Sequence, residues 1–134
     1  KKPLLEITPL GVLSYHHGDM RKYRGMPPAL WELYNNEKEM GITVQILKQK
    51  LDSGIPIEEK KIRINKNDTL EKLRDRAYEA SIEMLYNSLK KINNKNFKPI
   101  VIKNFGKIYT LPNLRQWLTL NIKILSRKIN HYIK

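Results

Sequence analysis

The sequence predicts an α/β fold, and three observations carry that prediction. Short apolar and β-branched runs lie in the first half of the chain, over residues 11–15, 42–47 and 55–64. A long segment with apolar residues at helical spacing follows over residues 68–92. The 134 residues suffice for one domain of ordinary size and not for two.

The first expected strand runs from Gly11 to Tyr15. It follows Pro9 and ends in the polar loop His16-His17-Gly18-Asp19, which is typical of a buried strand that leads into a loop. Pro27 and Pro28 suit the first turn of a helix, and we expect that helix over residues 28–35.

A strand, a turn and a return strand are expected next. Residues 42–47 are rich in β-branched side chains and roughly alternate, and residues 55–64 alternate again around Pro56. Between them, Asp52-Ser53-Gly54 has the composition of a tight turn.

The longest expected helix begins near Asp68 and ends near Ile92. Asp68 and Glu71 have the spacing of a capping box, with Asp in place of the usual Ser or Thr. Apolar side chains at helical spacing give the segment a wide apolar face, which must pack against a sheet. They are Leu70, Leu73, Ala77, Met84, Tyr78, Ile82, Leu85, Leu89 and Ile92.

The last third of the chain predicts a small hairpin and a final helix. Residues 100–102 and 107–109 flank Asn104-Phe105-Gly106, which is a plausible turn. Thr110 and Pro112 then open a helix whose apolar residues share one face: Leu114, Leu118, Ile122, Leu125 and Ile129.

Charge and composition restrict the class of protein. The formal net charge is +13, and residues 93–134 carry nine basic and no acidic residues, which favours an anionic partner for that segment. The absence of cysteine excludes disulfides, thiolate nucleophiles and Cys-bound metal centres. No apolar run approaches the ~20 residues that span a bilayer. Nothing near Lys1 resembles a signal sequence, so we expect a cytoplasmic protein and no membrane partner.

The densest group of reactive side chains follows the first strand. It contains two of the three histidines, and an imidazole can move protons or stabilise a developing oxyanion near neutral pH. A single histidine there would more often only hydrogen-bond a loop, but the neighbouring Asp19, Arg21 and Gly18 favour a site. Metal binding by the group is less expected than catalysis, because adjacent side chains on extended backbone point to opposite faces.

The order of several short motifs resembles the folate-dependent formyltransferases, the family of the methionyl-tRNA, glycinamide ribonucleotide and sugar formyltransferases. The resemblance covers roughly residues 10–92, and it matches the carboxyl-terminal half of the family's sheet with its long packing helix. Its motifs are Gly11 to His16, Lys22-Tyr23-Arg24-Gly25, Pro27-Pro28, Trp31, Gly41 to Val44, and Leu51-Asp52-Ser53-Gly54. Their ordered spacing is more specific than any single pattern.

The resemblance implies transfer of a formyl group from formyltetrahydrofolate to an amine. It implies that His16 stabilises the oxyanion, that Asp52 orients His16 and assists proton movement, and that Ser14 stands where the family has an Asn donor. It also implies that Leu51, Asp52, Ser53 and Gly54 line the folate pocket. The substrate entrance is expected to involve His17, Asp19, Arg21 and Arg24. His17 replaces the family's usual Pro and adds a titratable group.

The family also has an amino-terminal mononucleotide-binding half of about 100 residues. Because none precedes Lys1, we expect a catalytic half-domain over residues 1–92, a basic extension over residues 93–134, and little activity of this chain alone. The tail does not resemble a tRNA-binding barrel, so a small or sugar-type amine is favoured as the acceptor. The alternative is a non-catalytic module whose basic tail binds nucleic acid or another partner; a solvated basic surface explains the same charge.

Overall fold

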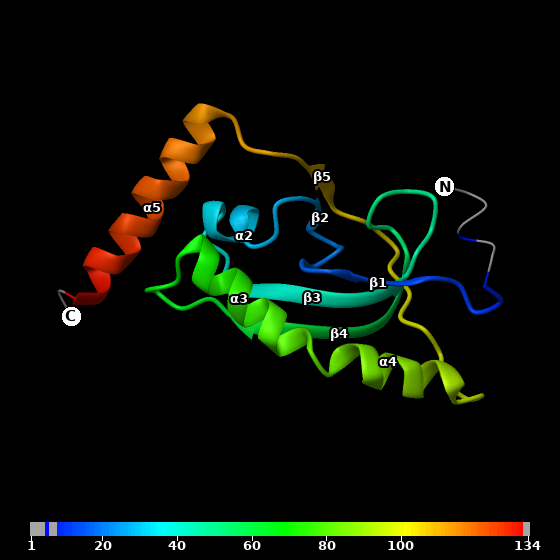
Figure 1. Cartoon of the computed structure of the whole chain (residues 1–134). Helices are drawn as coiled ribbons and strands as arrows, with labels where there is room; N and C mark the ends of the chain where they lie inside the picture. The colour runs from blue at the N-terminus through cyan, green and yellow to red at the C-terminus, as the bar shows by residue number, and fades with distance from the viewer. Residues whose placement is uncertain (1–4, 6–7, 133–134) are drawn as a thin grey trace.

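A computed structural model describes Leu5 and residues 8–132. The main sheet has three antiparallel strands in the order β1 (Leu13–His16), β3 (Glu39–Ile46) and β4 (Ile55–Arg63). A second pair is formed by β2 (Tyr23–Gly25) and β5 (Lys107–Tyr109), which run parallel. The helices are α2 (Leu30–Tyr34), α3 (Leu70–Ser81), α4 (Met84–Asn93) and α5 (Leu114–Tyr132), arranged as in Figure 1. The expected α/β class is confirmed.

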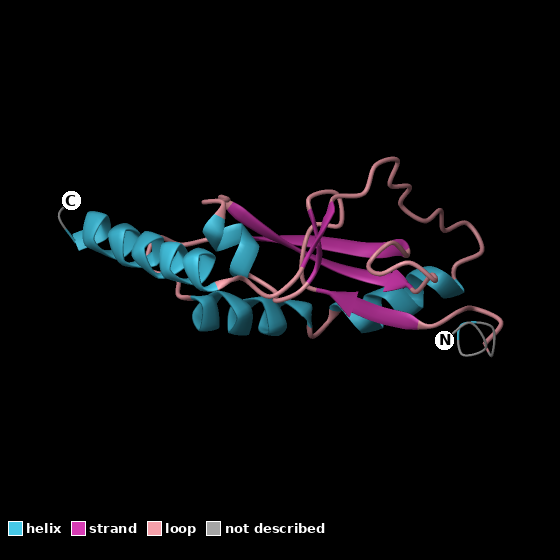
Figure 2. Ribbon diagram, turned by 90° about the horizontal axis from the view of Figure 1, so that it is seen from above, coloured by secondary structure: helices cyan, strands magenta, loops and turns pink. Residues whose placement is uncertain are grey.

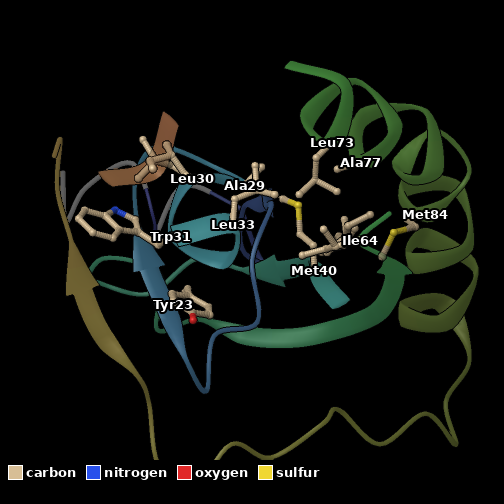
Figure 3. Close-up of a cluster of buried hydrophobic side chains, with 13 residues drawn as sticks. Tyr23, Ala29, Leu30, Trp31, Leu33, Met40, Ile64, Leu73, Ala77 and Met84 are labelled. Atoms are coloured by element: carbon tan, nitrogen blue, oxygen red, sulfur yellow. The ribbon is translucent and has the colours of Figure 1, made fainter. Parts of the chain in front are cut away.

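The core lies between the main sheet and the helices that cover it. Met40, Ile42 and Val44 of the central strand β3 are fully buried, and Leu73 of α3 and Met84 of α4 pack into the same cluster. Side chains of α2 join the cluster, so the sheet, α2 and the α3–α4 pair share one core (Figure 3). Figure 2 shows α3 and α4 running along one side of the sheet, as the apolar face of residues 68–92 predicts.

The paired strands β3 and β4 follow the expected positions closely. Their register shifts between Val44 and Gln45, where Gln45 faces Pro56. Proline lacks a backbone donor and is tolerated in a sheet at such an irregularity. The turn between the strands contains Asp52, whose positive φ of 42° is a conformation that Asp tolerates better than most residues.

The single long helix expected from Asp68 to Ile92 is wrong in one respect. The chain forms two helices, α3 and α4, and the interruption between them follows Ser81. There the Tyr15 hydroxyl of β1 donates to the Ser81 carbonyl at 2.8 Å and accepts from the Leu85 N–H at 3.1 Å. One side chain therefore satisfies a backbone group on each side of the interruption. Tyr78, Ile82, Leu85 and Leu89 of the predicted apolar face remain exposed.

The expected capping box is also wrong. Thr69, not Asp68, caps α3, and its side chain accepts from the Lys72 N–H at 3.2 Å. Asp68 is buried, accepts from the Asn65 N–H at 2.8 Å and forms an ion pair with Arg76. A capping pattern does not distinguish two adjacent acceptors when one has a stronger partner.

The hairpin expected around Asn104-Phe105-Gly106 does not form. Residues 100–102 are not a strand, and β5 pairs in parallel with β2, so that Tyr23 faces Lys107. Gly106 donates from its N–H to the Met20 carbonyl at 2.9 Å, and a Cβ on Gly106 would lie 2.3 Å from the Lys22 carbonyl carbon. The chain is therefore held against the loop before β2 instead of turning back on itself.

The final helix is present, and its packing differs from the pattern expected of a buried apolar face. Leu120 is buried, and Lys123 donates to the Tyr34 carbonyl at the end of α2. The predicted apolar stripe lies away from that contact and is exposed: Leu114, Leu118, Ile122, Leu125 and Ile129. Among the described helices, none is both long and apolar enough to cross a membrane.

Candidate active site

His16 is the last residue of β1, and it pairs with Thr43 of β3. Its ring is 7% exposed, and Nε2 lies 2.8 Å from the Tyr23 carbonyl oxygen. A Cβ on Gly18 would lie 2.7 Å from this nitrogen, so a residue without a side chain leaves room for the ring. The strand end and the loop to β2 thus fix the position of the imidazole.

Asp52 meets His16 from the turn between β3 and β4. Its Oδ2 lies 3.4 Å from His16 Nδ1 and accepts from the Gly25 N–H at 2.7 Å. Both ring nitrogens of His16 therefore face oxygen acceptors, and a doubly protonated ring donates to both. A cationic ring that is held beside a carboxylate can stabilise negative charge that develops nearby.

The turn that carries Asp52 is tied to its surroundings by several hydrogen bonds. Arg24 donates from Nη1 to the Leu51 carbonyl at 3.3 Å and from Nε to the Gly106 carbonyl at 2.8 Å. Ser53 Oγ donates to the Lys50 carbonyl at 2.9 Å, and the Gly54 N–H donates to Gln45 Oε1 at 2.9 Å. The sequence therefore brings Leu51, Asp52, Ser53 and Gly54 to the histidine as a fixed turn.

A cavity of about 300 Å³ opens beside the His16–Asp52 pair. Its walls come from the end of β1, the segment after β2 and the turn before β4. They are Tyr15, His16, His17, Gly25, Met26, Pro28, Leu51 and Asp52. Three of the predicted site residues besides Asp52 thus face one cavity, namely His16, His17 and Leu51.

His17 follows β1 at a bend and lines the same cavity as His16. Its ring stacks on Tyr15 with a centroid separation of 5.7 Å and meets the edge of Tyr78 at 4.7 Å. Burial lowers the pKa of His17 below its ordinary value, and the charge of His16 lowers it further. The neutral ring is therefore the favoured form at neutral pH.

Ser14 and two of the predicted substrate residues lie elsewhere. Ser14 is not part of the cavity wall, and its Oγ donates to the Tyr15 carbonyl at 3.3 Å. Arg21 forms a two-point ion pair with Glu59 at 2.6 and 3.0 Å and also contacts Asp19, and these bonds raise the pKa of its guanidinium. Asp19 and Arg21 line a separate small cavity at the surface of β3 and β4.

Several cavity residues were not singled out from the sequence as site residues. Tyr15 adjoins His16, and strand alternation predicts that adjacent side chains face opposite ways. The pattern therefore did not indicate that Tyr15 would share a cavity with His16. Met26 and Pro28 are in a Gly-Met-Pro-Pro segment, and such a cluster of Gly and Pro is a signal of special backbone next to a site.

Glu32 is a buried acid that lies outside the candidate active site. Glu32 of α2 is 3% exposed and lines a different cavity of about 380 Å³. Burial raises its pKa to about 7. Within residues 5 and 8–132, no three His, Asp or Glu side chains gather as metal ligands.

This chain is similar to known formyltransferases. The formyl transferase family model matches residues 1–89. Methionyl-tRNA formyltransferase from Thermodesulfovibrio yellowstonii is 31% identical over 115 residues, covering 86% of this chain and 37% of the relative. The bifunctional polymyxin resistance protein ArnA from Wigglesworthia glossinidia brevipalpis is 31% identical over 119 residues, covering 85% and 18%. This chain thus spans little more than a third of the first relative's length.

Solved structures show the same fold. PseJ, a formyltransferase from Anoxybacillus kamchatkensis, superposes with a TM-score of 0.71 at 19% identity, covering 85% of this chain and 60% of that chain. WlaRD, a sugar 3N-formyl transferase, superposes with a TM-score of 0.69 at 19% identity, covering 84% and 46%. With a family model that matches about two thirds of its residues, this chain belongs to the formyl transferase family.

Proposed function

We propose that this chain supplies the His16–Asp52 pair for transfer of a formyl group from formyltetrahydrofolate to an amine. The observation that carries the proposal is the separation of 3.4 Å between His16 Nδ1 and Asp52 Oδ2 beside a cavity of about 300 Å³. The pair stands in a chain that belongs to the formyl transferase family, and the resemblance of the sequence motifs implies the same two residues.

His16 is proposed to stabilise the negative charge that develops on the formyl oxygen as the amine attacks. Asp52 holds the ring in place, because its carboxylate faces one ring nitrogen at 3.4 Å. The Gly25 N–H bond and the Arg24 bond to Leu51 keep the carboxylate where it is needed. Ser14 points its hydroxyl at a neighbouring carbonyl, so its proposed contribution depends on a rotation of that hydroxyl toward the substrate.

The turn before β4 is the proposed contact with the folate. Leu51 is 55% exposed and Met26 is 59% exposed, so the two apolar side chains flank the Asp52 carboxylate at the cavity. Apolar walls with a few fixed polar groups fit a flat ring that has a polar edge. Ser53 and Gly54 complete this turn. PseJ is described in complex with tetrahydrofolate and WlaRD with a formylated tetrahydrofolate, which supports the same donor here.

A small or sugar-type amine is the proposed acceptor. PseJ is described with a UDP-linked formamido sugar, and WlaRD is a sugar formyltransferase. The methionyl-tRNA formyltransferase relatives support formyl transfer to an amine, and their name makes charged tRNA the alternative acceptor. His17 lines the cavity and Arg24 braces its Asp52 turn, so these two residues are proposed to contact the acceptor. Asp19 and Arg21 lie at a separate cavity and are bound to each other and to Glu59.

The chain is proposed to work with an amino-terminal portion of the kind its relatives carry. This chain covers only 37% of the first relative and 46% of WlaRD, so these proteins have further segments. We propose that residues 1–92 supply the catalytic half, and that residues 93–134 brace it. Pairing of β5 with β2 and the bond from Arg24 to Gly106 support that bracing role.

The test uses the full-length enzyme with formyltetrahydrofolate and a panel of acceptors that includes amino sugars, nucleotide-linked amino sugars and charged tRNA. We expect His16→Ala to lower kcat at least about 100-fold, because loss of one oxyanion donor has that effect in other enzymes. Lys95→Ala, at an exposed position after α4, is the control and keeps wild-type activity. Wild-type turnover by His16→Ala would reject the proposed catalytic pair. Preference for charged tRNA over every small amine would reject the proposed acceptor.

A further inference from the structure

The second histidine of the loop, His17, has a hydrogen-bonding environment that fixes which ring nitrogen carries the proton. Its Nε2 lies 3.4 Å from Ser81 Oγ at the end of α3. Ser81 Oγ has one hydrogen, and it donates that hydrogen to the Tyr78 carbonyl at 2.6 Å. Toward His17 this oxygen is therefore an acceptor. Nε2 of His17 carries the proton, and Nδ1 is left with a lone pair.

The ring is held in this position by packing on two sides. It stacks on Tyr15 with an interplanar angle of 20° and meets Tyr78 at 85°. Tyr15 is itself fixed by its two hydrogen bonds at the interruption between α3 and α4. A ring that is clamped in this way keeps a fixed orientation beside the cavity it lines.

The charged groups around His17 favour its neutral form. His16 is adjacent on β1, and burial together with the His16 charge lowers the pKa of His17. Asp52 faces His16, not His17, at 3.4 Å. From β4, the Lys60 ammonium donates to the Ala80 carbonyl at 3.1 Å, next to Ser81, and adds positive charge on that side. Burial and the charge of His16 thus keep a lone pair available on His17 near neutral pH.

We propose that His17 Nδ1 is the proton acceptor for the attacking amine, in the reaction for which His16 stabilises the oxyanion. This inference rests on the proposed function. A bond forms between the amine nitrogen and the formyl carbon, and one amine proton passes to His17 Nδ1. The bond between the formyl carbon and the folate nitrogen then breaks, and that nitrogen takes the proton from His17. The products are a formamide and tetrahydrofolate, and His17 returns to its neutral form.

The arrangement divides two tasks between adjacent histidines. His16 faces two oxygen acceptors, which suits a proton donor to the oxyanion. His17 donates to a serine and has a free lone pair, which suits a base. A pair of titratable groups in contrasting environments is the usual way to run acid and base roles at one pH.

The first test measures the tautomer directly, without turnover. In this chain with ¹⁵N-labelled histidine, we expect the ring nitrogens of His17 to show a protonated Nε2 and an unprotonated Nδ1 at pH 7.5. Ser81→Ala removes the acceptor that selects this tautomer, so we expect the Nε2–H population to fall while the His16 signals stay unchanged. A proton on Nδ1 in the wild-type chain would overturn the inference.

The second test uses the full-length enzyme and the pH dependence of kcat/KM. The acceptor is a weakly basic amine, so that its own protonation lies below the pH range that is scanned. We expect kcat/KM of the wild-type enzyme to fall at acid pH as His17 becomes protonated. We expect His17→Gln to lack this acid limb and to have a kcat about 100-fold lower. The His17→Gln variant keeps a hydrogen-bonding side chain but cannot take up a proton.

The two proposals fail in different ways. If the wild-type enzyme transfers formyl groups and His17→Gln keeps both its rate and its acid limb, the role of His17 is wrong and the proposed function stands. If the wild-type enzyme transfers no formyl group to any amine, the proposed function itself is wrong. Loss of activity with an unchanged acid limb would make His17 a positioning residue and would also overturn the inference.

Discussion

Replacing Gly25 with alanine tests how strongly the turn that carries Asp52 depends on the contact between β2 and β5. Gly25 has a φ of +88°, and a Cβ at this position would lie 2.1 Å from the Tyr109 carbonyl oxygen of β5. Both are backbone positions in paired strands, so neither can move alone. The Gly25 N–H also donates to Asp52 Oδ2 at 2.7 Å, so a shift of β2 disturbs the Asp52 carboxylate.

The expected cost has three parts. The left-handed backbone conformation costs an alanine about 1–2 kcal/mol. Forcing a methyl group into a packed site costs about 1–3 kcal/mol. Loss of the hydrogen bond to the Asp52 carboxylate costs about 1.5–3 kcal/mol if the strand moves away. Because the methyl clash and the loss of that bond are alternative responses to the same strain, only one of them adds to the conformational cost, and we expect a loss of about 2–5 kcal/mol in the free energy of unfolding.

Gly11→Ala is a matched control. Gly11 also has a positive φ, of +83°, but its Cβ would meet the Ile46 side chain at 2.6 Å, which can rotate away. We expect this variant to lose only about 1–2 kcal/mol, the conformational part. Urea denaturation followed by circular dichroism measures both variants. An equal loss of stability in the two would show that the contact with Tyr109 adds nothing, and would refute the reasoning.

Three further predictions concern the surroundings of the site. Tyr15→Phe removes the hydroxyl shared by Ser81 and Leu85, so we expect a loss of about 1–3 kcal/mol in the free energy of unfolding and faster amide exchange at Leu85. Arg24→Met removes two donors to backbone carbonyls, and we expect faster amide exchange across residues 51–54; unchanged exchange would show that the turn holds without it. The folded-state pKa of Glu32 is raised to about 7 from an ordinary 4.5, so the folded protein binds more protons between these values and its stability falls as pH rises from about 5 to 8. Glu32→Gln should flatten the dependence of the unfolding free energy on pH. An equally steep fall of stability in the variant would show that Glu32 is not its cause.

The main sheet was predictable because its signals are local. Residues 42–47 and 55–64 alternate, a tight turn separates them, and the structure pairs them as β3 and β4. The interruption after Ser81 was not predictable from the helix itself, because no Pro or Gly marks it. Its partner is the hydroxyl of Tyr15, 66 residues away in the sequence. Local propensity carries no information on such a contact.

The same distinction explains the hairpin that does not form. The composition of residues 104–106 suits a turn, and nothing in the sequence shows that β2 has a free edge available for β5. For the candidate site, the ordered motifs pointed to His16 and Asp52, whose contact the structure shows. They did not indicate that Asp19 and Arg21 would be held away from the cavity, because the ion pair with Glu59 depends on the register of β4.

The basic tail has a structural connection to the site that its charge alone does not reveal. Gly106 accepts from Arg24, and Tyr109 limits the space at Gly25, so the segment after α4 contacts both residues that hold the Asp52 turn. Removing residues 93–134 would therefore free Arg24 and uncover β2, and would leave Asp52 with fewer restraints opposite His16. The proposed role of the His16–Asp52 pair requires the carboxylate to be held at the ring, so these backbone contacts give the tail a part in the proposed chemistry that does not depend on its positive charge.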